Sequence, residues 1–288
     1  MQNIIGIDVG GSHVTLAQVS AEKKEIIPST YVREHVDSFA DAETIFSAWV
    51  SAIEKVAIDL DKTQLLIGVA MPGPFDYEKG ISLMQQGKFI HLYETNVKEE
   101  LAKRLSISSN QIYFLNDAAA FMEGEVFGGC VQDYNKVFGL TLGTGLGSTF
   151  YNVQLTTDED LWDSPFKDSM AEDYFATRWF VNRFKELTGT EISGTKDLLE
   201  QPKEIQSQIF DEYADHFSEF IIKYIIPYKA EVLVVGGNIA KTYPLFEARL
   251  HQNLKSQNSD IPVKVSGIFE DAAILGAASF ALKNFSNI

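Results

Sequence analysis

The spacing of apolar residues alternates between the period of a strand and the period of a helix. Residues 4–7 form a short apolar run of the kind found in buried strands, and residues 13–19 alternate apolar with polar positions, like the second arm of a hairpin. A third strand is expected around residues 26–32. Apolar positions then follow helical spacing over residues 45–57. The chain therefore predicts a hairpin followed by a helix.

The same alternation continues to the end of the chain. Its second half opens on another hairpin, as the first half does, and then returns to helices and strands. The remaining expected elements are a strand at 65–70, a helix at 97–105, a strand at 112–115, a helix at 118–126, a hairpin of 137–142 and 147–153, helices at 174–187 and 209–224, a strand at 231–235, a helix at 244–254, an edge strand at 263–265 and a helix at 271–282.

This order predicts an α/β protein with two related lobes. Strands that alternate with helices are typical of that class, and a hairpin at the start of each half indicates a repeated unit. We expect a smaller lobe over residues 1–115 and a larger lobe over residues 116–270. The final helix, about 271–288, is expected to pack back on the first lobe.

Three of the predicted strands end in turns that carry glycine. Glycine lets the backbone adopt conformations closed to other residues, and without a Cβ it brings peptide N–H groups within reach of phosphate oxygens. Three such turns in one chain predict a nucleotide held between the two lobes. The turns are Asp8-Val9-Gly10-Gly11-Ser12, Gly143-Thr144-Gly145-Leu146-Gly147-Ser148 and Gly236-Gly237-Asn238.

The common glycine loops do not match these turns. A P-loop requires Gly-x-x-x-x-Gly-Lys followed by Ser or Thr, which the chain lacks. A dinucleotide fingerprint must open a helix, whereas the turn at 143–147 runs into the strand pattern 148–151. What remains is a hairpin turn that grips phosphate, a geometry similar to that of the actin and hexokinase-like ATPases.

The charge of the chain narrows the choice of partners. Lys and Arg total 24 and Asp and Glu total 40, giving a net charge of −16 that repels nucleic acid and anionic lipid. Nucleotide phosphates would instead meet backbone N–H groups, helix N-termini and a divalent cation. No run of eighteen apolar residues and no basic leader occurs, so we expect a cytoplasmic protein. The lone Cys130 excludes an internal disulfide.

Six motifs, in order from residue 4 to about residue 280, resemble those of the ROK family of sugar kinases and sugar-responsive repressors. The resemblance implies a two-domain actin-like (ribonuclease H-like) ATPase fold, with nucleotide and sugar in the interdomain cleft and ATP with Mg²⁺ as phosphoryl donor. The resemblance is also compatible with assembly into a homodimer. The motifs are residues 5–12, 68–74, 115–119, 142–147, 234–239 and 271–278.

The resemblance also implies roles for the glycine turns. Asp8 would help to hold hydrated Mg²⁺, with Gly10, Gly11 and Ser12 at the phosphates. In the second turn, the Thr144 hydroxyl and its neighbouring amides would bind phosphate, and the third turn would pack on adenosine. The alternatives are that Asp8 only shapes its turn and that Thr144 is an ordinary hairpin residue. The implied nucleotide-binding residues of the last two turns are Gly143, Thr144, Gly145, Gly236, Gly237 and Asn238.

Asn116 and Asp117 are the strongest candidates for chemistry. By resemblance, Asp117 accepts the proton of the attacking sugar hydroxyl and Asn116 hydrogen-bonds ring hydroxyls. Both could instead cap the helix that follows. Gly73 would approach the hexose through its backbone, or serve only in a rigid Pro-Gly-Pro turn. Glu123 and Glu125 are expected on a solvated face or at an interlobe contact.

The chain also departs from the family pattern. ROK kinases usually carry Glu-x-Gly-His and a cysteine-rich zinc motif, but residues 156–170 contain no cysteine or histidine, so no zinc site is expected. Where the family has a lysine or arginine after the first glycine turn, this chain has His13. The interval in which the family's Glu-x-Gly-His motif is missing contains other candidates for sugar binding: Asp160, Trp162, Asp163 and Glu172. They could bind sugar by stacking and carboxylate hydrogen bonds, or Trp162 could be a core residue among solvated acids.

The resemblance therefore implies ATP-dependent phosphorylation of a hexose hydroxyl, with glucose 6-OH first and N-acetylhexosamine or fructose as alternatives. A repressor is disfavoured because its DNA-reading helices would precede the first strand, which begins here at residue 3 or 4. A non-catalytic sugar-binding protein is the other alternative, because the zinc segment is missing. Against it, Asp8, Thr144 and Asp117 are all present.

Overall fold

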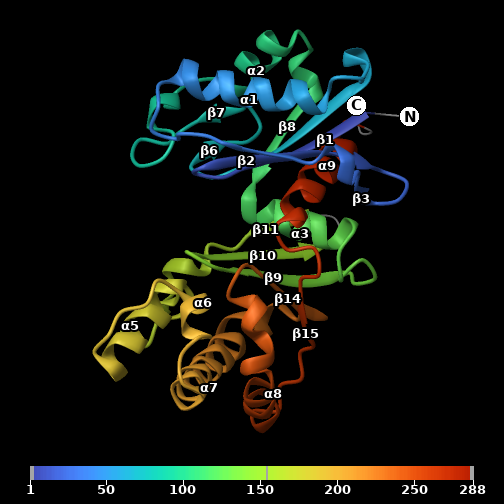
Figure 1. Ribbon diagram of the computed structural model, residues 1–288. Coiled ribbons are helices and arrows are strands. Elements are labelled where there is room, and N and C mark those ends of the chain that lie inside the picture. Colours follow the sequence, from blue (N-terminus) through green and yellow to red (C-terminus); the bar gives the residue numbers. More distant parts are fainter. Residues whose placement is uncertain (1–2, 154, 286–288) are drawn as a thin grey trace. The chain divides into compact units, whose positions relative to one another are not determined.

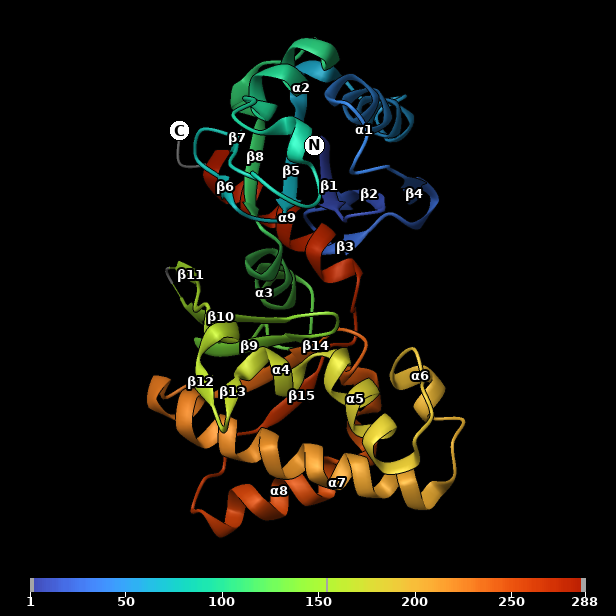
Figure 2. The same cartoon turned by 90° about the vertical axis from the view of Figure 1, so that its left-hand side faces the viewer.

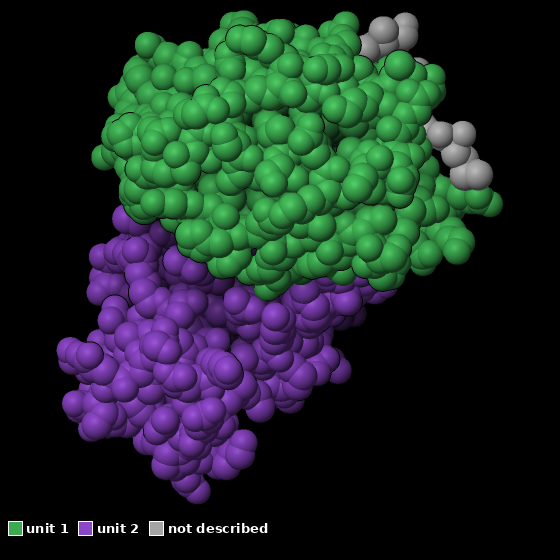
Figure 3. Space-filling model, turned by 45° about the horizontal axis from the view of Figure 1, so that its top comes forward, with its two compact units in different colours: residues 1–129, 270–288 green, residues 130–269 purple. Residues whose placement is uncertain are grey.

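The computed structural model describes residues 3–153 and 155–285, and its chain forms two compact units. The first unit contains residues 1–129 and 270–288, and the second contains residues 130–269 (Figure 3). The first unit therefore extends beyond the boundary expected at residue 115, and it includes the helix that follows.

The first unit is built on a mixed sheet with strand order β3-β2-β1-β5-β8, in which β4 also pairs with β2 (Figure 2). β1 and β2 form an antiparallel hairpin, whereas β1, β5 and β8 are parallel. The carboxyl ends of the parallel strands consequently lie at one edge. The strands are β1 (Asn3–Val9), β2 (His13–Ser20), β3 (Glu25–Ile26), β4 (Val32–His35), β5 (Leu65–Met71) and β8 (Ile112–Asn116).

The prediction of a single third strand at 26–32 is wrong. A 3₁₀ turn at Pro28–Thr30 separates the short strands β3 and β4, and both pair with β2. Proline has no N–H to donate to a ladder and its fixed φ suits the start of a turn. The local sequence therefore interrupts the strand, although the apolar pattern runs through it.

Helices cover both faces of this sheet. α1 (Ala42–Val56) and α2 (Val97–Leu105) pack on one face and α9 (Asp271–Phe285) on the other (Figures 1 and 2). The apolar stripe expected on α1 is buried, and the carboxylate of Asp41 accepts a hydrogen bond from the amide of Thr44 at its N-terminus. A small hairpin of β6 (Phe75–Asp76) and β7 (Ile81–Ser82) follows β5.

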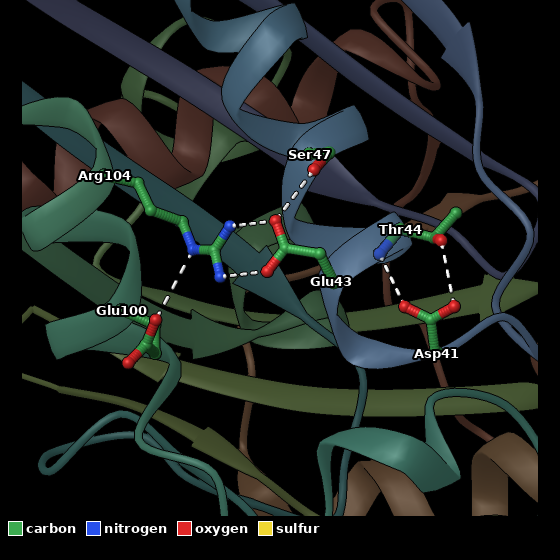
Figure 4. A network of polar contacts seen from close by, with 6 residues as sticks. All are labelled: Asp41, Glu43, Thr44, Ser47, Glu100 and Arg104. Carbon is green, nitrogen blue, oxygen red and sulfur yellow. Dashed lines mark hydrogen bonds and ion pairs between the residues drawn. The ribbon is translucent and has the colours of Figure 1, made fainter.

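An arginine joins the two helices of the first face. Arg104 of α2 donates two hydrogen bonds of 2.8 Å to the carboxylate of Glu43 on α1 (Figure 4). Its guanidinium also lies 5.0 Å from the ring centre of Phe46. These hydrogen bonds hold the pKa of Glu43 down to about 2. The bidentate pair therefore fixes the geometry of α1 on α2.

α9 approaches the sheet so closely that two strand positions must be glycine. A Cβ on Gly6 of β1 would lie 2.0 Å from the carbonyl oxygen of Ile274, and one on Gly68 of β5 would lie 1.9 Å from that of Ala277. Real Cβ atoms do not come this close to backbone oxygen. The glycines therefore serve the contact between helix and sheet.

α3 (Asp117–Phe127) packs on α9 in the same way. A Cβ on Gly276 would lie 1.8 Å from the carbonyl oxygen of Ala120, and one on Gly124 would lie 1.9 Å from that of Ala272. The Ala- and Gly-rich motif at 271–278 is thus a packing surface. This close contact explains why α3 belongs to the first unit.

The solvated-face interpretation of Glu123 and Glu125 is wrong. Their side chains are only 6% and 0% exposed. Glu123 accepts a hydrogen bond of 2.5 Å from Lys283 of α9, and the two form an ion pair within the first unit. A charge on α3 is thus buried with a partner, as burial of charge requires.

The second unit repeats the sheet topology of the first, with strand order β11-β10-β9-β14-β15. β9 and β10 form the antiparallel hairpin, and β9, β14 and β15 are parallel. β15 lies at the sheet edge, as expected. The strands are β9 (Lys136–Leu142), β10 (Leu146–Asn152), β11 (Leu155–Asp158), β14 (Val232–Gly236) and β15 (Val263–Val265), with a separate hairpin of β12 (Pro165–Phe166) and β13 (Ser169–Met170).

Helices with many aromatic residues form the core of this unit against its sheet (Figure 2). The helix expected at 174–187 is two helices, because the backbone at Ala176 is extended. The helix expected at 209–224 ends at Phe220 and continues as a π-helical turn, Ile221–Ile225. The helices are α4 (Ala171–Phe175), α5 (Thr177–Thr188), α6 (Thr195–Leu198), α7 (Lys203–Phe220) and α8 (Glu247–Ser256).

Candidate active site

The register of the first sheet brings the acidic and amide candidates to one edge. Asp8 of β1 pairs with Ala70 of β5, and Met71, one residue further, pairs with Asn116 of β8. Asp117 follows Asn116 as the first residue of α3. Asp8 therefore lies at the same end of the three parallel strands as Asn116 and Asp117, although they follow it by 108 and 109 positions in the chain.

Asn116 caps α3. Its Oδ1 accepts hydrogen bonds from the amides of Ala118 at 2.8 Å and Ala119 at 3.3 Å. The carboxylate of Asp117 also accepts from the amide of Ala118, at 2.9 Å, while its side chain remains accessible to solvent. The capping interpretation of Asn116 is confirmed. Capping by Asn116 is compatible with a role of Asp117 as a base, since a carboxylate at a helix N-terminus stays ionised more readily.

Tyr77 is a neighbour of this pair that the sequence analysis missed. Its hydroxyl donates to the carbonyl oxygen of Met71 at 3.1 Å and accepts from Nδ2 of Asn116 at 3.2 Å. A Cβ on Gly73 would lie 3.2 Å from the same hydroxyl, so the Pro-Gly-Pro turn also packs on Tyr77. Tyr77 follows β6, and nothing local in the sequence connects it with Asn116.

Burial raises the pKa values of both aspartates at this edge, and neighbouring negative charge adds to the shift of Asp8. Burial, followed by the negative charges of Asp117 and Glu270, raises the pKa of Asp8 to about 7, while Arg33 lowers it. Surrounding protein atoms also raise the pKa of Asp117 even though its side chain reaches solvent, and the amide of Ala118 opposes that shift. Arg33 pairs with Glu270 at 2.9 Å. The edge therefore carries negative charge that a cation would offset.

The first glycine turn presents unpaired amides next to Asp8. The amide of Gly10 donates to the carbonyl oxygen of His13 at 2.8 Å, which closes the turn. Within residues 3–153 and 155–285, the amides of Gly11 and Ser12 have no hydrogen-bond partner. His13 contacts the Ser12 hydroxyl at 3.0 Å through Nδ1. Two N–H groups are thus available to an anion.

The second and third glycine turns meet at one edge of the second sheet. Gly236 at the end of β14 pairs with Thr141 near the end of the parallel strand β9. Gly237 has a positive φ of 85°, and a Cβ there would lie 2.3 Å from the carbonyl oxygen of Leu142. Glycine is therefore required at 237 by packing within the unit. The exposed Asn238 accepts a hydrogen bond from Lys241 at 2.9 Å.

Two side chains brace the second glycine turn. The carbonyl oxygen of Gly143 accepts from the amide and hydroxyl of Thr177 at 2.7 and 2.9 Å. The carboxylate of Glu172 accepts from the amide of Leu146 at 3.0 Å and from Arg178 at 2.5 Å. One carboxylate oxygen of Glu172 thus holds this turn and the other binds Arg178, and its contact with sugar stays a prediction.

The bracing leaves the tip of the turn open. In the part of the chain that the structure describes, the amides of Thr144 and Gly145 have no hydrogen-bond partner. Each unit therefore presents a glycine turn with two free N–H groups beside the end of its central strand.

The acidic segment around residue 160 forms a turn in the second unit. Asp160, with a φ of 48°, precedes the 3₁₀ turn Leu161–Asp163. The Trp162 side chain is 43% exposed, so the interpretation of Trp162 as a core residue is wrong. The sugar-binding roles of Asp160 and Trp162 stay predictions.

We expect the purified protein to contain no stoichiometric zinc, because residues 156–170 offer neither thiol nor imidazole. Among the described residues, no group of three or more His, Cys, Asp or Glu side chains has the geometry to hold a metal ion. Elemental analysis of protein purified without added metal measures this directly. One zinc per chain would overturn the interpretation of this segment.

The duplicated sheet and the glycine turns at the strand ends define an actin-like ATPase fold of the α/β class. Residues 4–157, more than half of the 288-residue chain, match the model of the ROK family, and the chain belongs to that family. No helix in residues 3–153 and 155–285 is long and apolar enough to cross a membrane.

Three proteins illustrate the similarity, which extends over nearly the whole chain. A glucokinase of Thermotoga maritima is 26% identical, covering 96% of each chain. An N-acetyl-D-glucosamine kinase of Haemophilus influenzae is 21% identical over 96% of this chain and 98% of its own. A ROK family glucokinase from Streptomyces griseus, solved with glucose and AMPPNP, shares the fold with a TM-score of 0.75 at 18% identity, covering 98% of this chain and 99% of its own.

Proposed function

We propose that this protein is an ATP-dependent sugar kinase that phosphorylates a hexose hydroxyl, with glucose 6-OH as the first candidate. One observation carries the proposal: the parallel register places Asp8, Asn116 and Asp117 at the same sheet edge, next to a glycine turn with free amides. Membership of the ROK family and full-length similarity to two sugar kinases support it.

Asp117 acts as the general base in this proposal. Its carboxylate accepts the proton of the sugar hydroxyl as that oxygen bonds to the γ-phosphorus of ATP. The bond from the γ-phosphorus to the bridging oxygen breaks, and ADP leaves with that electron pair. The raised pKa of Asp117 makes its carboxylate a better proton acceptor at neutral pH. The solvent-accessible side chain leaves room for the substrate hydroxyl.

The free amides of the two glycine turns hold phosphate oxygens. Gly11 and Ser12 would supply two donors and Thr144 and Gly145 two more, in fixed positions that need no reorganisation during transfer. Gly236, Gly237 and Asn238 are proposed to contact adenosine. The four amides of the first two turns would thus meet the phosphates of the nucleotide in a chain with a net charge of −16.

Asn116 and Gly73 are proposed to bind the sugar. The Oδ1 of Asn116 is used by two amides, but its Nδ2 has two hydrogens and only one goes to Tyr77. The second can reach a ring hydroxyl. Tyr77 positions this amide, since its hydroxyl is held by the carbonyl oxygen of Met71.

Asp8 fits a role at Mg²⁺. A half-buried carboxylate with a pKa of about 7, close to two further negative charges, gains from a nearby cation that restores its ionised form. We propose that Asp8 holds the ion through water. When bound with the nucleotide, Mg²⁺ would neutralise charge on the β- and γ-phosphates.

Which hexose is used depends on contacts that the sheet edges do not define. The two relatives differ in sugar, glucose in one and N-acetyl-D-glucosamine in the other, at 26% and 21% identity. Glucose is our first candidate because the more similar of the two is a glucokinase. The exposed Trp162 and nearby Asp160 are proposed to contribute to the choice.

A panel assay tests the function. We expect ADP to form from ATP only when a suitable hexose is present, tested with glucose, N-acetylglucosamine, N-acetylmannosamine and fructose against a sugar-free control. Excess EDTA should abolish the signal, because backbone amides alone do not neutralise the triphosphate. Unchanged turnover in EDTA would contradict the role of Asp8. Sugar binding without turnover would support the non-catalytic alternative.

A further inference from the structure

A lysine lies directly over the first glycine turn. A Cβ built on Gly11 would be 2.3 Å from each of Cδ, Cε and Nζ of Lys88. The end of the Lys88 side chain therefore rests against Gly11, and the absence of a Cβ at this position is what allows it to do so. The two come from segments 77 positions apart in the sequence.

The backbone around Lys88 is held by the core of the first unit. Phe89 is fully buried, its amide donates to the carbonyl oxygen of Ser38 at 2.7 Å, and its ring centre lies 5.5 Å from that of Trp49. Gly87 and Phe89 both have positive φ, 76° and 59°. Lys88 is thus an exposed residue of a tight turn whose position the fold sets.

The ammonium of Lys88 has no partner in the part of the chain that the structure describes. It forms no ion pair and no hydrogen bond within residues 3–153 and 155–285, although the protein carries 40 acidic residues. Arg33, the other cation that influences this edge, is paired with Glu270. Three unused donors and a full charge therefore lie beside two unused amides, those of Gly11 and Ser12.

We propose that Lys88 binds the terminal phosphate of ATP at the first glycine turn and stabilises the charge on the phosphoryl group during transfer. The proposal rests on the proposed kinase function and adds a catalytic residue to it. It also supplies a cation at a turn whose own residues 8–13 include no lysine or arginine. An ammonium is a compact charge suited to phosphate oxygen.

Lys88 takes no part in the exchange of atoms. The proton of the sugar hydroxyl goes to Asp117, and the electron pair of the broken bond leaves with ADP. Lys88 keeps its proton throughout and contributes only charge and hydrogen bonds, which grow stronger as charge develops on the equatorial oxygens. Its loss should therefore affect ATP and not the sugar.

The test compares Lys88→Met, which keeps an apolar stem over Gly11, with Lys103→Met as the control. Lys103 is an exposed lysine without an ion pair among the described residues, near the end of α2, which leads to the opposite edge of the sheet. We expect Lys88→Met to lower kcat/KM for ATP about ten- to a hundredfold and to weaken binding of a non-hydrolysable ATP analogue similarly. In Lys88→Met, binding of ADP and of sugar should change less than about twofold. In Lys103→Met, kcat/KM for ATP and binding of the ATP analogue should also change less than about twofold. Lys88→Arg should recover part of the loss.

Calorimetry with the ATP analogue and with ADP keeps the two proposals separable. A wild-type protein that is active, with Lys88→Met indistinguishable from Lys103→Met, would overturn the role of Lys88 alone. Equal weakening of ADP and of the ATP analogue would overturn the assignment to the terminal phosphate. A wild-type protein that is inactive on every sugar would count against the kinase function. If Lys88→Met then still lost binding of the ATP analogue but kept binding of ADP, the phosphate contact would be supported. If Lys88→Met does not fold, Lys88→Gln provides the same comparison.

Discussion

Asp117→Asn is expected to lower the turnover of sugar phosphorylation by at least about 10²-fold, the contribution of a positioned general base. The substitution keeps the size of the side chain but removes the group that accepts the hydroxyl proton. Steady-state assays with saturating ATP and sugar measure the loss. Binding of sugar and nucleotide, measured by calorimetry, should stay within roughly tenfold, because Asn116 and the free amides of the glycine turns remain.

The fold should tolerate this change. Asn116 provides the cap of α3, and an asparagine at 117 can still accept the hydrogen bond from Ala118. We therefore expect the free energy of unfolding to change by no more than about 1 kcal/mol. Asp59→Asn is the matched control, because Asp59 is exposed in the loop before β5, at the other end of the strand. A folded Asp117→Asn protein with near wild-type turnover would remove Asp117 from the mechanism.

Asp8→Asn is expected to make the metal-free protein more stable and the enzyme less active. In the folded protein the pKa of Asp8 is raised from 3.8 to about 7, so the folded state holds a proton that the unfolded state releases. Stability from this group is present below pH 4 and is lost as the pH rises towards 7. Asparagine is neutral in both states and avoids this loss. The expected gain at pH 8 is on the order of 1–3 kcal/mol.

Denaturant unfolding in EDTA at pH 5 and pH 8 measures this effect. The stability difference between Asp8→Asn and wild type should grow with pH, whereas Asp59→Asn should show no such trend. In the assay, Asp8→Asn should require more divalent cation for half-maximal turnover. A variant that is less stable than wild type at pH 8 would contradict the raised pKa of Asp8.

Much of the architecture could be predicted because its signals are local. The strand and helix periods located both hairpins and most of the helices, and the glycine turns marked the ends of the central strands. The strand expected at 26–32 and the helix expected at 174–187 are each two elements, divided at Pro28 and Ala176. The apolar pattern did not show these divisions, because a backbone break can occur within a continuous hydrophobic stripe.

The candidate residues of the site also came from the sequence, through motifs and family resemblance. Asp8 and Asn116-Asp117 stand at strand ends, and parallel pairing of β1, β5 and β8 brings strand ends together. The partners of these residues could not be predicted. Tyr77 reaches Asn116 from the hairpin after β5, and Glu172 holds the second glycine turn from the start of α4.

The sequence alone settled the α/β class, the two hairpin-led halves, the glycine turns and the absence of cysteine and histidine from residues 156–170. These follow from residue type and spacing, which each segment carries independently of the others. Tertiary packing decided that α3 lies on α9 through Gly124 and Gly276, and that Lys88 lies over Gly11. Such contacts depend on how segments far apart in the chain pack together, and no periodicity within either segment encodes them.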